Sequence, residues 1–315
     1  MTTTPVLAPA AAPLARTVRG SGPGLLLAHG AGGSVHDNWG PLLDDLAAHR
    51  TVVAPDYPGS GDSPDEPGVA HSLDELADRL VAAADAAGLA DFDLAGYSLG
   101  AAVAVRIATR HPGRVRSLLL LAGVAGGSQR FRLLADQAVA LTAHPALWAD
   151  HSLATAFGRT WVDALPAERF AGLRAALAAA PVPAGFRWQF ELAARADVRA
   201  ELARIAVPTL VVSTTEDGLV TPEQHRALAR GIPGARLAEL PAGHLPMVER
   251  LPELRDLMVG FLTGAAASGP ADASEPADAQ RGFGRRPGPV RPGGTGTPHR
   301  AGTFVRACAS ENSPV

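Results

Sequence analysis

The sequence has few of the residues that support disulfide chemistry, phosphate loops or charge-driven binding. Of its 315 residues one is cysteine, Cys308, which excludes an internal disulfide and a cysteine-based metal site. Lysine does not occur, so the glycine-rich segment 30–33 lacks the Lys that follows the glycines of a phosphate-binding P-loop. The formal net charge of −3 gives no electrostatic basis for binding nucleic acid or an anionic membrane.

Long apolar runs are also absent. No stretch reaches the about 18 uninterrupted apolar residues of a transmembrane helix. The apolar segment 1–12 lacks the positive charge that opens a signal peptide. We therefore expect a soluble, cytoplasmic protein, monomeric or homodimeric, with no nucleic-acid or membrane partner.

What the sequence does contain is a regular alternation of apolar runs and amphipathic stretches. Because the runs are apolar throughout, they resemble strands covered on both faces. The pattern predicts an α/β fold with a mostly parallel central sheet and helices on both faces. The predicted strands are 17–19 (an edge), 25–28, 51–54, 92–95, 115–121, 208–212 and 235–240. The predicted helices are 39–49, 72–87, 99–110, 222–230 and 249–262.

The alternation stops after Gly127, and the segment 128–204 has a helical pattern without a clear strand. It holds three of the four tryptophans, and we expect it to form a helical cap inserted into one α/β domain spanning 17–264. Residues 1–16 are predicted to be flexible. The segment 265–315, rich in Gly, Pro, Ala and Arg, has too little apolar bulk to fold. We interpret it as an inert disordered tail; a weak arginine-based interaction tail is the alternative.

The segment Gly96-Tyr97-Ser98-Leu99-Gly100 follows a predicted strand and opens a predicted helix. In that context G-x-S-x-G is typical of a nucleophile elbow, a turn so tight that glycine is needed on either side of the serine. The N-terminus of the following helix favours developing negative charge at the turn. The pattern predicts that Ser98 is the nucleophile of a serine hydrolase.

A serine nucleophile needs a base, and the base needs an orienting acid, in the chain order Ser, acid, His. Asp217 and His244 each follow the end of a predicted strand, so they are expected at the same sheet edge as Ser98. Glu216 is the rival acid. We prefer Asp217 because Gly218 and the helix start that follows place it at the apex of its loop.

The loop after the strand 25–28 holds three glycines, which let backbone N–H groups turn inward. We predict that the backbone N–H groups of Ala31 and Leu99 form an oxyanion hole, and that His29 has the structural task of holding the loop. The residues expected to contact substrate are Tyr97, Gly30, Leu219, Trp148 and Trp161. For Tyr97, packing beneath the cap is the alternative.

The other histidines show no metal-like i, i+4 pair, so no metal site is predicted. We expect them at the surface or at helix ends, with His36 a second candidate for the pocket because it lies near the glycine loop. They are His36, His49, His71, His111, His144, His151 and His225.

Several motifs together resemble the α/β-hydrolase fold superfamily, specifically its esterase, lactonase and C–C hydrolase branch with a helical cap. They are His29-Gly30, Asp-Tyr-Pro-Gly-Ser-Gly-Asp-Ser at 56–63, the elbow, Asp217 with Val220 and Pro222, and Gly-His-Leu-Pro-Met-Val-Glu-Arg at 243–250. The resemblance covers 17–263 and implies that the 56–63 loop is structural and that 128–204 is the cap. Dehalogenases and epoxide hydrolases are expected to carry Asp where Ser98 stands, which argues against both.

The leading hypothesis is therefore a carboxylesterase-like enzyme that hydrolyses a small to medium, apolar ester or related acyl compound through an acyl-enzyme. No metal or organic cofactor is implied. The alternatives are a lactonase, a thioesterase, a C–C bond hydrolase and a cofactor-free perhydrolase. A non-catalytic ligand receptor on the same fold is a further alternative, although a receptor does not require Ser98, Asp217 and His244.

Overall fold

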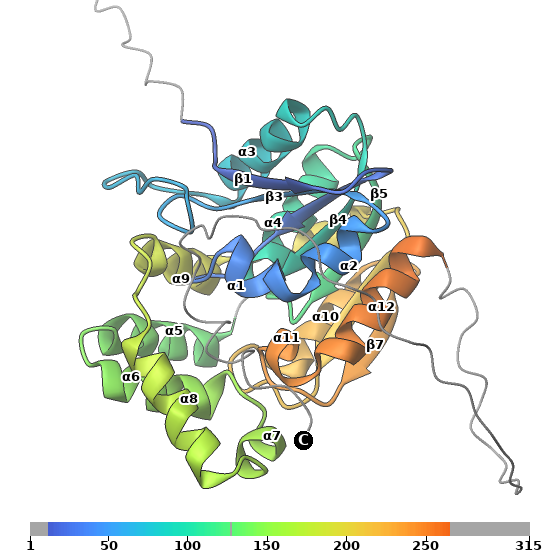
Figure 1. The fold of residues 1–315 in the computed structure, drawn as a ribbon. Coiled ribbons are helices and arrows are strands. Elements are labelled where there is room, and N and C mark those ends of the chain that lie inside the picture. Colours follow the sequence, from blue (N-terminus) through green and yellow to red (C-terminus); the bar gives the residue numbers. More distant parts are fainter. Residues whose placement is uncertain (1–11, 127, 265–315) are drawn as a thin grey trace, which may run out of the picture.

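The computed structural model of this chain describes residues 12–126 and 128–264, so the predicted tail and Cys308 lie outside the described residues. Within them, seven strands form one sheet in the order β1-β3-β2-β4-β5-β6-β7 (Figure 1). Strand β1 is antiparallel to β3 and all other neighbours are parallel, which confirms the predicted sheet. The strands are β1 (Arg16–Arg19), β2 (Gly24–Ala28), β3 (Thr51–Pro55), β4 (Phe92–Tyr97), β5 (Val115–Leu121), β6 (Thr209–Thr214) and β7 (Arg236–Leu240).

The predicted covering of both sheet faces is also confirmed. Alternate residues of one strand point to opposite faces; in β2, Leu26 packs in one apolar cluster, while Leu25 and Leu27 pack in the other. One cluster includes α3 (Leu73–Ala86), α4 (Leu99–Arg110) and α10 (Pro222–Gly231). The other includes α1 (Val35–Trp39), η1 (Gly40–Leu42), α2 (Leu43–Ala47), α11 (Pro246–Glu249) and α12 (Leu251–Thr263).

Two predicted helices are divided in the structure. The helix expected at 39–49 begins earlier, because the Ser34 hydroxyl caps it by accepting the Asp37 N–H at 3.2 Å. Pro41 then interrupts it, since proline cannot donate to the preceding turn. The helix expected at 249–262 is likewise split at Arg250, whose φ of −142° is not helical.

Between β5 and β6 the chain forms the helical insertion, which lies to one side of the sheet in Figure 1. Its elements are α5 (Gln129–Leu141), α6 (Pro145–Thr155), α7 (Arg159–Asp163), α8 (Ala167–Ala179), α9 (Phe186–Arg195) and η2 (Arg199–Arg204). No named strand occurs among the described residues of 128–204, as the helical pattern indicates. Every helix in the described part of the chain is too short or too polar to cross a membrane.

Candidate functional site

Ser98 occupies the tight turn between β4 and α4. Its φ of 55° lies in the left-handed region, a strained conformation that is retained mainly at functional sites. A Cβ atom on Gly96 would lie 2.2 Å from the carbonyl oxygen of Gly100, and one on Gly100 would lie 2.2 Å from that of Ala28. Both glycines are therefore required by the close approach of backbone segments, as the nucleophile-elbow interpretation expects.

Three side chains from separate loops form one hydrogen-bond chain. The Oγ atom of Ser98 lies 2.9 Å from Nε2 of His244, and Nδ1 of His244 lies 2.7 Å from Oδ2 of Asp217. Because an ionised carboxylate only accepts, Nδ1 donates to Asp217 and Nε2 accepts the Ser98 hydroxyl. No more than 5% of any of the three residues is exposed. This arrangement can move a proton from Ser98 to His244 away from bulk water.

Asp217, rather than Glu216, lies against His244. Its Oδ1 accepts the backbone N–H groups of Leu219 and Val220 at 2.9 and 2.8 Å, and its Oδ2 accepts the Thr214 hydroxyl at 3.0 Å. These donors compensate the buried negative charge. The carboxylate of Glu216 instead accepts the N–H of Thr160, at the start of α7. The two candidate acids therefore have different partners: Asp217 contacts His244, and Glu216 contacts Thr160.

The glycine loop after β2 is held by side chains at successive peptide groups. Nδ1 of His29 donates to the carbonyl oxygen of Gly30 at 2.8 Å, and its Nε2 accepts the Tyr57 N–H at 2.9 Å. Burial lowers the pKa of His29 to about 4, so the ring stays neutral and keeps this tautomer. These contacts agree with the structural task expected of His29.

The two predicted oxyanion donors are available. Within the described residues, neither the Ala31 N–H nor the Leu99 N–H donates a hydrogen bond to the chain. Ala31 lines the cavity above Ser98, and Leu99 is the first residue of α4, where helix N–H groups have no partner within the helix.

A cavity of about 460 Å³ opens above Ser98 and His244. The helical insertion provides an aromatic wall, formed by Phe131, Trp148, Phe186 and Phe190. The rings of Phe186 and Phe190 stack at 4.4 Å between centroids, and Trp148 meets Phe186 edge-on at 5.2 Å. The size and the mostly apolar lining suit a small-molecule ligand.

Of the predicted substrate contacts, Tyr97, Leu219 and Trp148 line this cavity. Tyr97 has a second contact, because its hydroxyl donates to the carbonyl oxygen of His244 at 2.8 Å. Gly30 does not line the cavity; it lies so close to Tyr97 that a Cβ would be 2.8 Å from the ring. Trp161 does not line the cavity either.

The position of Trp161 does not support its predicted contact with substrate. Its ring stacks on Phe157 at 5.4 Å, in a separate apolar cluster of the insertion. His36 is not among the lining residues either. Sequence reasoning missed Phe131, Phe186 and Phe190 as wall residues; the pair at i and i+4 in α9 is the pattern that points to one shared helix face.

The charges around the cavity are of one sign. Its lining contains the carboxylates of Asp37 and Asp65 and no arginine from the described residues. Burial lowers the pKa of His151, which also lines the cavity, so this ring does not supply a compensating positive charge at neutral pH. A carboxylate of a substrate that came close to Asp37 or Asp65 would therefore be repelled by them.

Glu249 ties the His244 loop to the helical insertion. Its carboxylate accepts the N–H of Gly243 at 2.9 Å and the N–H of Gly158 at 3.1 Å. The His244 N–H donates to the carbonyl oxygen of Ala156 at 2.7 Å, next to this junction. Burial raises the pKa of Glu249 to about 7, although both N–H donors oppose that shift. Sequence reasoning placed Glu249 in a family motif without giving it a task.

We expect Glu249→Gln to change how stability depends on pH. A carboxyl whose pKa is raised in the folded state holds its proton there after the unfolded chain has lost it. Folding stability therefore falls as pH rises from the ordinary glutamate pKa to about 7. Between pH 5 and 7 the wild type should lose up to about 1.4 kcal/mol per pH unit relative to the variant. Urea unfolding of both proteins at pH 5 and 8 measures this; a constant difference would contradict it.

Three histidines depart from the predicted surface or helix-end positions. His225 is fully buried in α10, with Nδ1 3.2 Å from the Ser213 hydroxyl and Nε2 3.8 Å from Oδ2 of Asp217. His151 lines the cavity, and His71 is buried against the ring of Trp188 at 4.2 Å. Their isolated positions in sequence gave no indication of this burial, which arises from packing between distant segments.

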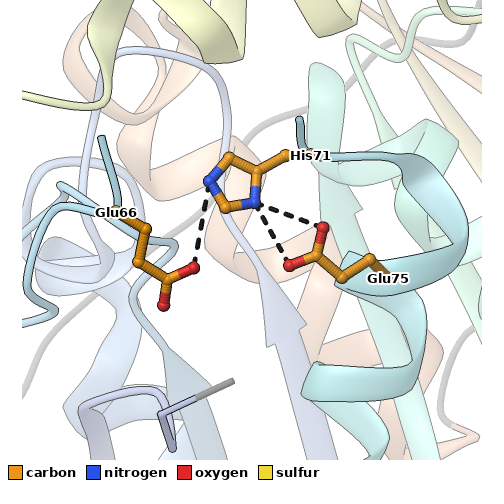
Figure 2. Close-up of side chains that lie close together, drawn as sticks. All are labelled: Glu66, His71 and Glu75. Carbon is orange, nitrogen blue, oxygen red and sulfur yellow. Dashed lines mark hydrogen bonds and ion pairs between the residues drawn. The ribbon is translucent and has the colours of Figure 1, made fainter. Parts of the chain in front are cut away.

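Figure 2 shows His71 between the carboxylates of Glu66 and Glu75, with its ring nitrogens turned toward both. The three donor atoms lie within 4.8 Å of one another, a spacing compatible with a metal ion. However, the Arg79 guanidinium donates to both oxygens of Glu66, at 2.8 and 2.9 Å, and to Glu75 at 3.2 Å. Arg79 thereby holds the pKa of Glu66 below its usual range. Since the Arg79 guanidinium already pairs with both carboxylates, we interpret the cluster as an ion-pair network.

The comparisons with known proteins agree with the fold just described. A family model described as the alpha/beta hydrolase fold matches residues 23–251. A pyrrolizixenacetamide deacetylase of Xenorhabdus hominickii is 35% identical over 250 residues, covering 78% of this chain and 92% of that protein. A 2-hydroxymuconate semialdehyde hydrolase of a Pseudomonas species is 32% identical over 263 residues, covering 79% and 90%.

Solved structures of hydrolases resemble the whole described domain. The enol-lactonase of Burkholderia xenovorans superposes with a TM-score of 0.68 at 28% identity, covering 79% of this chain and 96% of that one. The two relatives reported above are likewise named as a deacetylase and a hydrolase, each with a different substrate. With the matching family model, the seven-stranded sheet and the serine turn after β4, this chain belongs to the α/β-hydrolase fold family.

Proposed function

We propose that the protein is a serine hydrolase that cleaves a carboxylic ester or related acyl bond through an acyl-enzyme. The observation that carries the proposal is the buried chain from Ser98 Oγ through His244 to Asp217, with links of 2.9 and 2.7 Å, at the base of a mostly apolar cavity. A purely ligand-binding protein gains nothing from a strained serine aligned with an imidazole.

In the proposed reaction, Ser98 Oγ attacks the substrate carbonyl carbon while His244 Nε2 takes the hydroxyl proton. Asp217 keeps Nδ1 protonated and stabilises the imidazolium that results. Collapse of the tetrahedral intermediate breaks the acyl bond, and His244 returns the proton to the leaving alcohol. Water then attacks the acyl-enzyme by the same steps, releasing the acid and restoring Ser98.

The Ala31 and Leu99 N–H groups are the proposed donors to the oxyanion. Both are free of other hydrogen bonds within the described chain, and the second adds the dipole of α4. Each such donor is typically worth about 2.7–4 kcal/mol in the transition state. We propose that the helical insertion acts as the cap that closes this site from water.

The proposed substrate is small to medium, apolar and free of carboxylate groups. We expect p-nitrophenyl butyrate to be hydrolysed with a kcat/KM about 10-fold or more above that of mono-p-nitrophenyl succinate, because the added carboxylate would approach Asp37 and Asp65 in a partly enclosed cavity. Steady-state kinetics on this pair at low salt measures the ratio. Asp37→Asn should lower this ratio of kcat/KM values. Equal rates, or a preference for the succinate, would contradict the proposed specificity.

Amide deacetylation is a second candidate, favoured by the 35% identity to a deacetylase. An amide leaving group must be protonated as it departs, and His244 is placed to do this. Comparing p-nitrophenyl acetate with p-nitroacetanilide, at matched acyl group, separates the two: comparable kcat/KM values indicate an amidase, and a preference of many orders of magnitude for the ester indicates an esterase.

A fluorophosphonate probe tests the proposal without knowledge of the substrate. The probe should label the intact protein at Ser98, as read by mass spectrometry of the tryptic peptide. Labelling that is absent, or that falls on another residue, would favour a non-catalytic receptor. A panel of lactones, acyl thioesters and vinylogous diketones then distinguishes the esterase from the lactonase, thioesterase and C–C hydrolase alternatives. The cytoplasmic location stays a prediction from the sequence.

A further inference from the structure

One side chain of the helical insertion reaches the glycine loop at the site. Gln189 of α9 is fully buried, and its Oε1 accepts the N–H of Gly32 at 2.8 Å. Its Nε2 donates to the Ser60 hydroxyl at 2.8 Å and to the carbonyl oxygen of Pro58 at 3.3 Å. The amide therefore links three separate parts of the chain: the insertion, the glycine loop and the loop after β3.

The partners define the orientation of this amide. The Gly32 N–H can only donate, so it requires the carbonyl end of the side chain, and the carbonyl oxygen of Pro58 can only accept, so it requires the NH₂ end. A flipped amide would leave a buried donor and a buried acceptor unsatisfied, which is costly. The Gln189 amide therefore has a single orientation, which the Gly32 N–H and the Pro58 carbonyl oxygen define.

This contact completes a series along the glycine loop. The Gly30 N–H donates to Oδ1 of Asn38 at 2.9 Å, the carbonyl oxygen of Gly30 accepts from His29 at 2.8 Å, and the Gly32 N–H donates to Gln189. Three consecutive peptide groups are therefore oriented by three side chains. In a trans peptide the N–H points away from the C=O, so the bond to His29 turns the Ala31 N–H in the opposite direction. Only this N–H of the three is left for a ligand.

The same helix supplies part of the substrate wall. Phe186 and Phe190 line the cavity and pack over the glycine loop, since a Cβ on Gly32 would lie 2.7 Å from Phe186 and 2.8 Å from Phe190. Gln189 lies between them in sequence. Helix α9 therefore contacts both the space where substrate binds and the peptide that follows Ala31.

We propose that Gln189 is a positioning residue through which the helical insertion holds the Ala31 N–H in line with the oxyanion. The inference rests on the proposed function, because it assigns Gln189 a task in that reaction. Gln189 is not among the residues that line the cavity, makes no hydrogen bond with Ser98, and acts through the Gly32 peptide. Its contribution appears when the oxyanion forms, so it should affect kcat more than KM.

The test compares Gln189→Leu with Arg187→Leu on p-nitrophenyl butyrate. Leucine has a similar volume and removes both ends of the amide. Arg187 is on the same helix with a 71% exposed side chain, so its variant controls for a polar-to-leucine change in α9. We expect Q189L to lower kcat by about 10- to 100-fold, less than the loss of a whole oxyanion donor, with KM within about 2-fold. R187L should keep both parameters.

Two further measurements separate positioning from a general structural role. Phenylboronic acid forms a tetrahedral adduct on serine, so its affinity for Q189L should fall by about the same factor as kcat. The inhibition constant of p-nitrophenol, the alcohol product, should not change. Circular dichroism and thermal unfolding check that each variant is folded.

The inference is overturned if folded Q189L retains the wild-type kcat, or if boronic acid and product alcohol lose affinity equally. These outcomes leave the proposed function intact as long as the wild type hydrolyses the ester and is labelled at Ser98. A wild type with neither property refutes the proposed function instead.

Discussion

Ser98→Ala is expected to lower kcat for p-nitrophenyl butyrate by about 10⁴- to 10⁶-fold, the range seen when a serine nucleophile is removed. Alanine keeps the Cβ atom, so the turn at φ 55° and the contacts of Gly96 and Gly100 are preserved. The fold should therefore survive, with an unfolding midpoint close to that of the wild type. The measurement is steady-state kinetics together with thermal unfolding of both proteins.

The control for Ser98→Ala is its reaction with the fluorophosphonate probe, which should be lost together with turnover. Binding of the product alcohol should remain, since the cavity walls are unchanged. A folded S98A protein with ester turnover within a few-fold of the wild type would show that another residue performs the attack, and the proposed mechanism would be wrong.

Asp217→Asn should have the next largest effect, lowering kcat by about 10⁴-fold. With asparagine at this position, the amide oxygen would accept the N–H groups of Leu219 and Val220. The NH₂ group would then face Nδ1 of His244 and donate to it, so Nδ1 could not stay protonated. The ring would then favour the tautomer with Nε2 protonated, which cannot take the proton of Ser98.

Glu216→Gln is the matched control for Asp217→Asn. Glu216 is adjacent in sequence and carries the same charge, but its carboxylate bonds to the Thr160 N–H, an interaction that a glutamine oxygen can keep. We expect kcat within about 3-fold of the wild type, as for a substitution outside the reacting groups. If E216Q were the more damaging of the two variants, the assignment of the acid would have to be exchanged.

Local patterns were sufficient to predict most of the sheet and its helices. Helix α4 and strand β5 have the predicted bounds, because an uninterrupted apolar run and a helix start directly after a strand are encoded by adjacent residues. Helix α3 begins after Ser72, whose hydroxyl accepts the Glu75 N–H at 3.1 Å, as the spacing of the two residues indicates. Where Pro41 and Arg250 interrupt a helix, periodicity alone did not reveal the break.

The candidate site was predictable only in part. Ser98, Asp217 and His244 follow strand ends, and parallel strands bring such positions to one edge whatever the rest of the chain does. The cavity wall has no such rule. Trp148 and Trp161 are both in the insertion, yet the first lines the cavity and the second packs on Phe157. The direction that each tryptophan faces depends on how α6 and α7 pack, which apolar character does not specify.

From the sequence alone one can infer the order of strands and helices along the chain, the turn that presents Ser98, and a later acid and histidine at strand ends. The elements and the turn follow from short-range sterics and periodicity, which act between neighbouring residues. The shared edge of the acid and the histidine follows from the parallel sheet. The groups around these residues depend on tertiary packing. Gln189 bonds to Gly32, 157 residues away in the chain, and Glu249 bonds to both Gly158 and Gly243. Contacts of this kind arise because buried polar groups need hydrogen-bond partners, and packing decides which groups are close enough. The separation of the two partners in the sequence does not indicate that they will meet.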